Sequence, residues 1–140
     1  MSSAPEWLAM GRAVLQQQPF SRLLGSELTA WDGPRCTLEL PLRDELLQQN
    51  GFAHGGVVSY LADNALTFAG GGALQGAAVT AEYKINYVRP AVGQRLIARA
   101  EAVSTGKGQA VCRCDVLVVS DGNEKLCAVA QGTISRLGGT

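Results

Sequence analysis

Residues 54–72 read HGGVVSYLADNALTFAGGG, and this stretch decides the fold class of the chain. Its apolar residues recur at helical spacing, at positions 58, 61, 62, 65 and 69. Three polar residues four apart, Ser59, Asp63 and Thr67, form one narrow stripe on this helix. A helix that is apolar almost all round is a buried helix. The sequence therefore predicts a buried helix from Gly55 to about Gly70, ended by the three glycines at 70–72.

Strand-like segments follow this helix. They cover residues 77–88, 95–103, 109–119 and 124–136, and short turns such as Pro90 to Gly93 separate them. In the first segment, alternation predicts that Val79, Ala81, Tyr83, Ile85 and Tyr87 share one face. Short turns between long strands favour antiparallel pairing, so we expect a meander of these four strands.

The residues before the helix are expected to add a helix and two strands. Residues 7–18 predict a short helix (about 5–18 at most) that Pro19 ends, and residues 22–31 a possible strand. Residues 35–42 alternate as a half-buried strand, and residues 43–50 form a loop or a short helical turn. The chain is thus predicted to be α+β, with one domain over residues 1–140 and its sheet wrapped on the helix. The open edges of such a sheet favour pairing with a second subunit.

Composition excludes several classes of protein. Twelve lysines and arginines balance twelve aspartates and glutamates, which argues against nucleic-acid binding. No signal peptide or membrane-spanning stretch is evident, so we expect a cytoplasmic protein without a membrane partner. The four cysteines, at 36, 112, 114 and 127, lack the spacing of a metal site and are expected to be buried structural thiols that catalysis does not need. No cofactor is predicted.

Three motifs give the chain a specific resemblance. His54-Gly55-Gly56, then Leu61-Ala62-Asp63-Asn64-Ala65 and Ile85-Asn86-Tyr87-Val88-Arg89-Pro90, resemble the signature of the hotdog-fold acyl-CoA thioesterases of the PaaI (phenylacetic acid degradation) type. The order of elements agrees from about Arg35 to Arg136. The resemblance implies the hotdog fold, hydrolysis of an acyl-CoA or aryl-CoA thioester, and a homodimer or homotetramer.

Gly55 and Asp63 are the principal candidate catalytic residues. Gly55 opens a helix, where unpartnered backbone N–H groups and the helix dipole suit an oxyanion; two glycines can equally form a tight loop. Asp63 is either the nucleophile or general base, or a structural acid bound to Ser59, Thr67 or the backbone. Eight residues of helix separate the two by about 12 Å. One subunit therefore cannot place both on one carbonyl, and the family resolves this with a dimer.

The other site residues are implied mainly by the resemblance. His54 assists at the thioester carbonyl or caps the helix, and Thr80 matches a hydroxyl that positions water. Gln48 stands where the family often has Asn, and Asn50 is the second amide that can contact substrate. Further substrate contacts are expected from Gly56, Asn64, Arg89 and Lys107, with Lys84 as another cation near the site.

Two rival functions remain at this point. A hotdog-fold hydratase or dehydratase needs a base and an acid, and His54 and Asp63 supply those residue types, although no D-x-N-x-x-H pattern is present. A non-catalytic acyl-CoA-binding protein would need no acid at position 63. Release of free thiol separates hydrolysis from both rivals.

Overall fold

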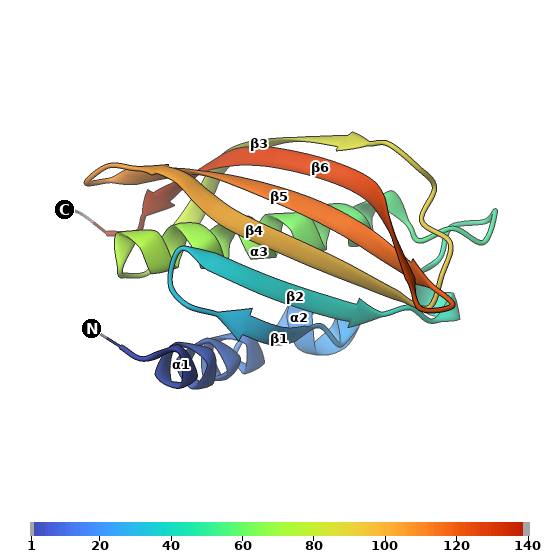
Figure 1. The fold of residues 1–140 in the computed structure, drawn as a ribbon, viewed down its shortest axis with the longest axis horizontal. Coiled ribbons are helices and arrows are strands. Elements are labelled where there is room, and N and C mark those ends of the chain that lie inside the picture. Colours follow the sequence, from blue (N-terminus) through green and yellow to red (C-terminus); the bar gives the residue numbers. More distant parts are fainter. Residues whose placement is uncertain (1, 139–140) are drawn as a thin grey trace.

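An antiparallel six-stranded sheet wraps around one long helix in the computed structural model, which describes residues 2–138 (Figure 1). The elements are α1 (Ala4–Gln16), α2 (Pro19–Leu24), β1 (Glu27–Trp31), β2 (Arg35–Pro41), the short helix η1 (Asp44–Leu46), α3 (Gly55–Leu74), β3 (Ala78–Tyr87), β4 (Arg95–Thr105), β5 (Gln109–Ser120) and β6 (Asn123–Arg136). The predicted α+β hotdog architecture is confirmed. The prediction of one domain over the whole chain also covers Met1, Gly139 and Thr140, which lie outside the described residues.

The central helix α3 forms the core, as its pattern predicts. Leu61, Ala62, Ala65, Leu66 and Ala69 are fully buried. The helix packs against the inner face of the sheet and contacts β2, β3, β4, β5 and β6. The polar stripe of α3 faces the strand β3, and its side chains form hydrogen bonds with that strand. These contacts belong to the candidate site described below.

The prediction that Gly70-Gly71-Gly72 ends the helix is wrong, because α3 continues to Leu74. Tertiary packing explains these glycines better than helix termination. A β-carbon on Gly70 would lie 2.5 Å from the Ile134 side chain, and one on Gly72 would lie 1.9 Å from the Gly33 carbonyl oxygen. The helix therefore needs small residues where β6 and the β1–β2 turn approach it.

The predicted meander is correct for β4, β5 and β6 but wrong for β3. The strand order is β1-β2-β4-β5-β6-β3, so β3 pairs with β6 at the far edge of the sheet. The segment after β3 does not turn back as a hairpin. Its Ala91 carbonyl accepts a hydrogen bond of 2.9 Å from the Ala53 N–H, in the loop before α3. This contact directs the chain across the end of the sheet to β4.

A β-bulge also changes the predicted faces of β3. Thr80 pairs with Ile134 and Glu82 with Thr133, so Ala81 is the extra residue. The bulge shifts the alternation by one. Thr80 therefore faces α3 together with Tyr83, whereas Val79 and Ala81, which were expected to join Tyr83, are exposed.

The N-terminal part differs from the predicted helix and strand. α1 begins at Ala4, after a capping box formed by Ser3 and Glu6, and ends at Gln16. Pro19 begins a second helix, because a proline is well suited to the first helical turn. Residues 22–24 are thus helical and not part of a strand, and β1 starts only at Glu27.

The four cysteines are free and buried, as predicted. Burial raises the pKa of Cys112 to about 11, of Cys114 to about 12 and of Cys127 to about 11. These thiols therefore carry little thiolate near neutral pH, which suits packing more than nucleophilic chemistry. No helix within residues 2–138 is both long and apolar enough to cross a bilayer.

Candidate active site

The N-terminus of α3 presents a backbone donor. His54 is the N-cap residue, and its Nδ1 accepts a hydrogen bond of 2.8 Å from the Gly56 N–H. The structure thus supports a capping role for His54. Within residues 2–138, no hydrogen bond engages the N–H of Gly55, the first residue of the helix. Because the helix dipole places partial positive charge here, this N–H suits a carbonyl oxygen that gains negative charge.

A cavity of about 360 Å³ lies at this end of the molecule. Its lining residues are Gln48, Phe52, Ala53, Gly55, Val58, Tyr87, Val88, Arg89, Pro90, Ala91 and Cys127. Three predicted site residues, Gln48, Gly55 and Arg89, are therefore brought together. The wall is mostly apolar with a few polar groups, which is typical of a site for an organic ligand.

The loop before α3 is held by short-range hydrogen bonds. The Gln48 N–H donates to the Phe52 carbonyl at 2.8 Å, and the Gln48 side-chain oxygen accepts from the Asn50 N–H. The Asn50 residue is exposed. Gln48 therefore lines the cavity and also fixes its loop, whereas Asn50 contributes its backbone to that loop.

Asp63 lies farther along α3, outside the cavity lining. Its Oδ1 accepts a hydrogen bond of 2.6 Å from the Thr80 hydroxyl, and the Thr80 and Thr67 hydroxyls lie 2.9 Å apart. Thr80 is thus the partner of Asp63, a contact that the bulge in β3 makes possible. Asp63 is half-buried, although it lies on the predicted buried helix.

A polar seam between α3 and β3 connects the two regions. Tyr87 donates to the Gly55 carbonyl at 2.8 Å, Tyr83 contacts the Ser59 hydroxyl, and Thr80 binds Asp63. The two tyrosines were not among the predicted site residues. The signal that could have found them is the four-residue spacing of 55, 59 and 63, matched by inward-facing residues of β3.

The remaining predicted substrate contacts lie elsewhere. The Asn64 amide donates to Gln18, Ser21 and Tyr60, so it joins α3 to the N-terminal helices. Lys84 is exposed on β3. Lys107 lies in the β4–β5 turn and accepts a hydrogen bond through its carbonyl from Arg136, whose guanidinium also binds the Leu74 carbonyl. Lys107 is therefore near the C-terminal end of α3, opposite Gly55.

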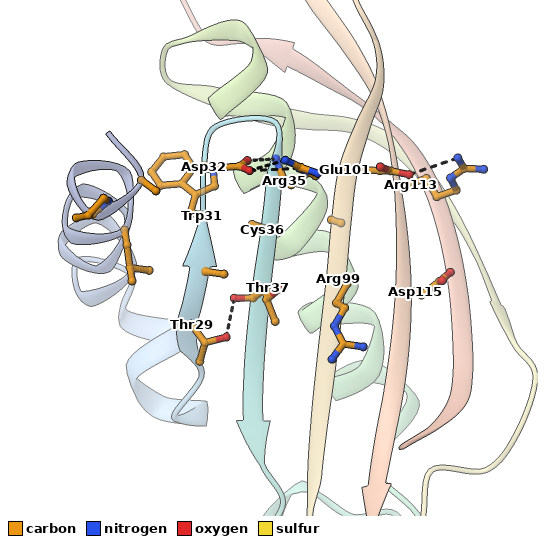
Figure 2. Close-up of a pocket in the computed structure, with 15 residues that line it drawn as sticks. Thr29, Trp31, Asp32, Arg35, Cys36, Thr37, Arg99, Glu101, Arg113 and Asp115 are labelled. Carbon is orange, nitrogen blue, oxygen red and sulfur yellow. Dashed lines mark hydrogen bonds and ion pairs between the residues drawn. The ribbon is translucent and has the colours of Figure 1, made fainter. Parts of the chain in front are cut away.

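A larger hollow of about 780 Å³ lies on the other face of the sheet, beside α1. Figure 2 shows its charged side chains on β2, β4 and β5, with α3 behind the sheet. Its arginines are paired with acids: Arg35 with Asp32, Arg113 with Glu101 and Arg99 with Glu124. None of the predicted catalytic residues lines this hollow. We therefore place the candidate chemistry at the smaller cavity and the seam.

Comparison with known proteins agrees with this geometry. The model of the thioesterase superfamily matches residues 50–125, which include His54, Asp63 and Thr80. The chain belongs to the thioesterase superfamily. The matched region begins at the loop before α3 and runs into β6, so it covers Gly55, Asp63 and Thr80, whereas Gln48 and Cys127 of the cavity wall lie just outside it.

Several known proteins resemble the chain over most of its length. It is 31% identical, over 86% of its residues and 79% of the relative, to an esterase candidate from Saccharolobus solfataricus. A thioesterase family protein from Silicibacter pomeroyi is 30% identical with a TM-score of 0.86, over 95% of this chain and 99% of that one. The phenylacetic acid degradation protein PaaI from Thermus thermophilus is 34% identical with a TM-score of 0.75, over 86% and 100%. These likenesses support thioester hydrolysis as the general chemistry of this thioesterase-superfamily chain.

Proposed function

We propose that the protein hydrolyses acyl-CoA or aryl-CoA thioesters to a free acid and CoA. The observation that carries this proposal is the Gly55 N–H, which starts a 20-residue helix and lines a cavity without a hydrogen-bond partner in the described residues. A thioester carbonyl gains negative charge on its oxygen when a nucleophile attacks. A fixed N–H donor stabilises that charge, and removing such a donor costs about 10²–10³-fold in kcat.

Asp63 supplies the second half of the reaction. It either attacks the carbonyl carbon or removes a proton from the attacking water. Thr80 holds one carboxylate oxygen at 2.6 Å, so the other oxygen keeps a defined direction. The Thr80 and Thr67 hydroxyls are also suitably placed to orient a water molecule beside the acid.

Asp63 and Gly55 act on one thioester only across a subunit interface. Both residues belong to the same helix, and eight residues span about 12 Å. The stripe that carries Asp63 faces β3, which is an edge strand. A partner chain at that edge brings its own Gly55 end toward this Asp63. The proposed active unit is therefore a homodimer, alone or within a tetramer.

The proposed substrate contacts follow from the same geometry. Arg89 lines the cavity, and its guanidinium suits the phosphates of CoA. Gln48 lines the same cavity, and its amide suits a hydrogen bond to the reacting group. Gly56, Asn50, Asn64, Lys84 and Lys107 stay predictions; Lys107 lies at the opposite end of α3 and reaches the site only from a partner. The similarity to a phenylacetic acid degradation protein favours aryl-CoA substrates.

The hydrogen bond at His54 Nδ1 favours hydrolysis over the hydratase alternative. A hydratase would need a basic nitrogen on this residue, but Nδ1 already accepts the Gly56 N–H. A ring that is neutral and accepts at Nδ1 carries its proton on Nε2. That ring offers a donor, which suits a thioester carbonyl.

A direct test combines a substrate panel with two variants of Gly55. Acyl-CoA and aryl-CoA esters, including phenylacetyl-CoA, are assayed for release of free CoA thiol. Gly55→Pro removes the proposed donor at a position where proline is favoured, and the His54 ψ of 136° allows a following proline. Gly55→Ala keeps the N–H, and its β-carbon would make only ordinary contacts with Tyr87, at 3.5–3.7 Å.

We expect Gly55→Pro to lose about 10²–10³-fold in kcat, whereas Gly55→Ala stays within about tenfold of the parent protein. Folding is checked by circular dichroism. Equal activity of a folded proline variant would remove Gly55 from the mechanism. Absence of thiol release across the whole panel would contradict the proposed function itself.

A further inference from the structure

A chain of hydrogen bonds crosses the peptide group between Gly55 and Gly56. The Tyr87 hydroxyl donates to the Gly55 carbonyl at 2.8 Å, and the Gly56 N–H donates to His54 Nδ1, also at 2.8 Å. The carbonyl and this N–H belong to the same planar peptide unit. A hydrogen bond to the carbonyl therefore polarises the N–H on the other side and strengthens its bond to the imidazole. Tyr87 and His54 are coupled through this peptide.

Both rings pack against the glycines of this peptide. A β-carbon on Gly55 would lie 3.5 Å from the Tyr87 hydroxyl oxygen, and one on Gly56 would lie 3.0 Å from His54 Nδ1. The Gly56 contact is tight, so any side chain there would displace the imidazole. The double glycine thus serves the placement of His54 as well as the approach of a substrate.

The Tyr87 bond is not needed to satisfy the helix. In an α-helix, the Gly55 carbonyl already accepts from the backbone N–H four residues on. Within one subunit Tyr87 is 52% exposed, so burial in that subunit does not force its hydroxyl to find a protein partner. It also lines the same cavity as Gly55 and Gln48. An additional bond at this position points to a role in the site.

The bond to Nδ1 fixes which ring nitrogen carries the proton. Nδ1 accepts from Gly56, so it is unprotonated, and a neutral imidazole then has its proton on Nε2. The ring in this state has one N–H donor and no free basic nitrogen. The same residue with the opposite tautomer would lose the N-cap bond and gain a basic Nε2.

We propose that Tyr87 is a positioning residue that holds His54 as the Nε2–H tautomer through the Gly55–Gly56 peptide. His54 then donates a hydrogen bond to the thioester and does not act as a base. The catalytic part rests on the proposed function, whereas the tautomer is a property of the protein alone and is measurable without substrate.

Nitrogen NMR of the imidazole tests the tautomer directly. The chain contains a single histidine, so one pair of ring ¹⁵N signals reports on His54 without further assignment. At a pH where the ring is neutral, we expect the proton on Nε2 in the parent protein. Tyr87→Phe keeps the ring and removes the hydroxyl, and should shift the spectrum toward a mixture of tautomers.

Tyr83→Phe is the matched control. Tyr83 lies four residues earlier on the same strand, but its hydroxyl contacts Ser59 and not the Gly55–Gly56 peptide. The His54 spectrum should therefore match that of the parent protein. In the acyl-CoA assay, Tyr87→Phe should lower kcat about 3- to 10-fold with little change in KM, as expected for loss of one neutral hydrogen bond.

Three results would overturn the proposal. The first is a parent protein with its proton on Nδ1. The second is a folded Tyr87→Phe protein with an unchanged tautomer, even if its kcat falls, because Tyr87 would then act by another route. The third is an equal spectral change in Tyr83→Phe. If no substrate is hydrolysed, the proposed function fails, and the spectra still decide the tautomer.

Discussion

At the scale of single residues, the test of the mechanism is the charge of Asp63. Asp63→Asn keeps the size of the side chain and still offers an oxygen to Thr80, but it removes the proposed nucleophile or base. We expect kcat to fall roughly 10²–10⁴-fold, the scale for a positioned proton acceptor. KM should change little, since the lost interaction matters mainly in the transition state. Steady-state thiol release on the best CoA ester measures both.

A second variant controls for the loss of charge alone. Asp115→Asn removes an exposed carboxylate on the outer face of the sheet, at the larger hollow. It should leave kcat within about twofold, because surface charges so placed contribute little. A folded Asp63→Asn protein with full turnover would make Asp63 a structural acid, bound to Thr80 for packing reasons.

The sequence predicted the residues of the α3 end of the site better than their partners. The motifs indicated Gly55 and Asp63, and the resemblance pointed to Gln48 although the family often has Asn there; Gly55 and Gln48 line one cavity, whereas Asp63 lies outside its lining. Tyr87 and Thr80 are positioned by the register of β3 against α3. That register depends on a bulge at Ala81, and no residue type at Ala81 signals it.

At the scale of elements, the small residues late in α3 set how closely the sheet approaches. Gly72→Ala should destabilise the protein by about 1–3 kcal/mol or more, because its β-carbon would lie 1.9 Å from the Gly33 carbonyl oxygen. Gly71→Ala is the matched control, since its nearest contact would be 3.3 Å and alanine favours a helix interior. Denaturant unfolding at one fixed protein concentration compares the two. Equal stability of both variants would contradict this account of Gly72.

Local sequence signals failed where tertiary contacts decided the outcome. Three consecutive glycines are a strong helix-stop signal, yet α3 continues to Leu74, and close packing against Ile134 and Gly33 accounts for glycine at positions 70 and 72. Pro19 resembled a stop and instead starts α2. The alternating strands of β4, β5 and β6 were predictable, because their pattern and short turns agree with the pairing that forms.

At the scale of the whole molecule, the proposed shared site places the second subunit at the edge strand β3. Within residues 2–138, β3 pairs with β6 alone, and its inner face carries the Thr80 contact to Asp63. The exposed apolar residues Val79 and Tyr87 lie on this strand, and Val88 follows it. A second copy at this edge would cover that apolar surface and complete the site. A stable, fully active monomer in light scattering would contradict this arrangement.

Mixed dimers test the shared site most directly. Asp63→Asn and Gly55→Pro subunits should each be nearly inactive alone. If each site takes Gly55 from one subunit and Asp63 from the other, a mixed dimer has one intact site and one with both changes. Random exchange makes about half of the dimers mixed, so activity should recover to about a quarter of the parent value. Sites contained within single subunits would give no recovery, because every site in the mixture would then carry one of the two changes. The two outcomes differ by far more than the error of a thiol-release assay, provided that gel filtration shows the variants to exchange subunits.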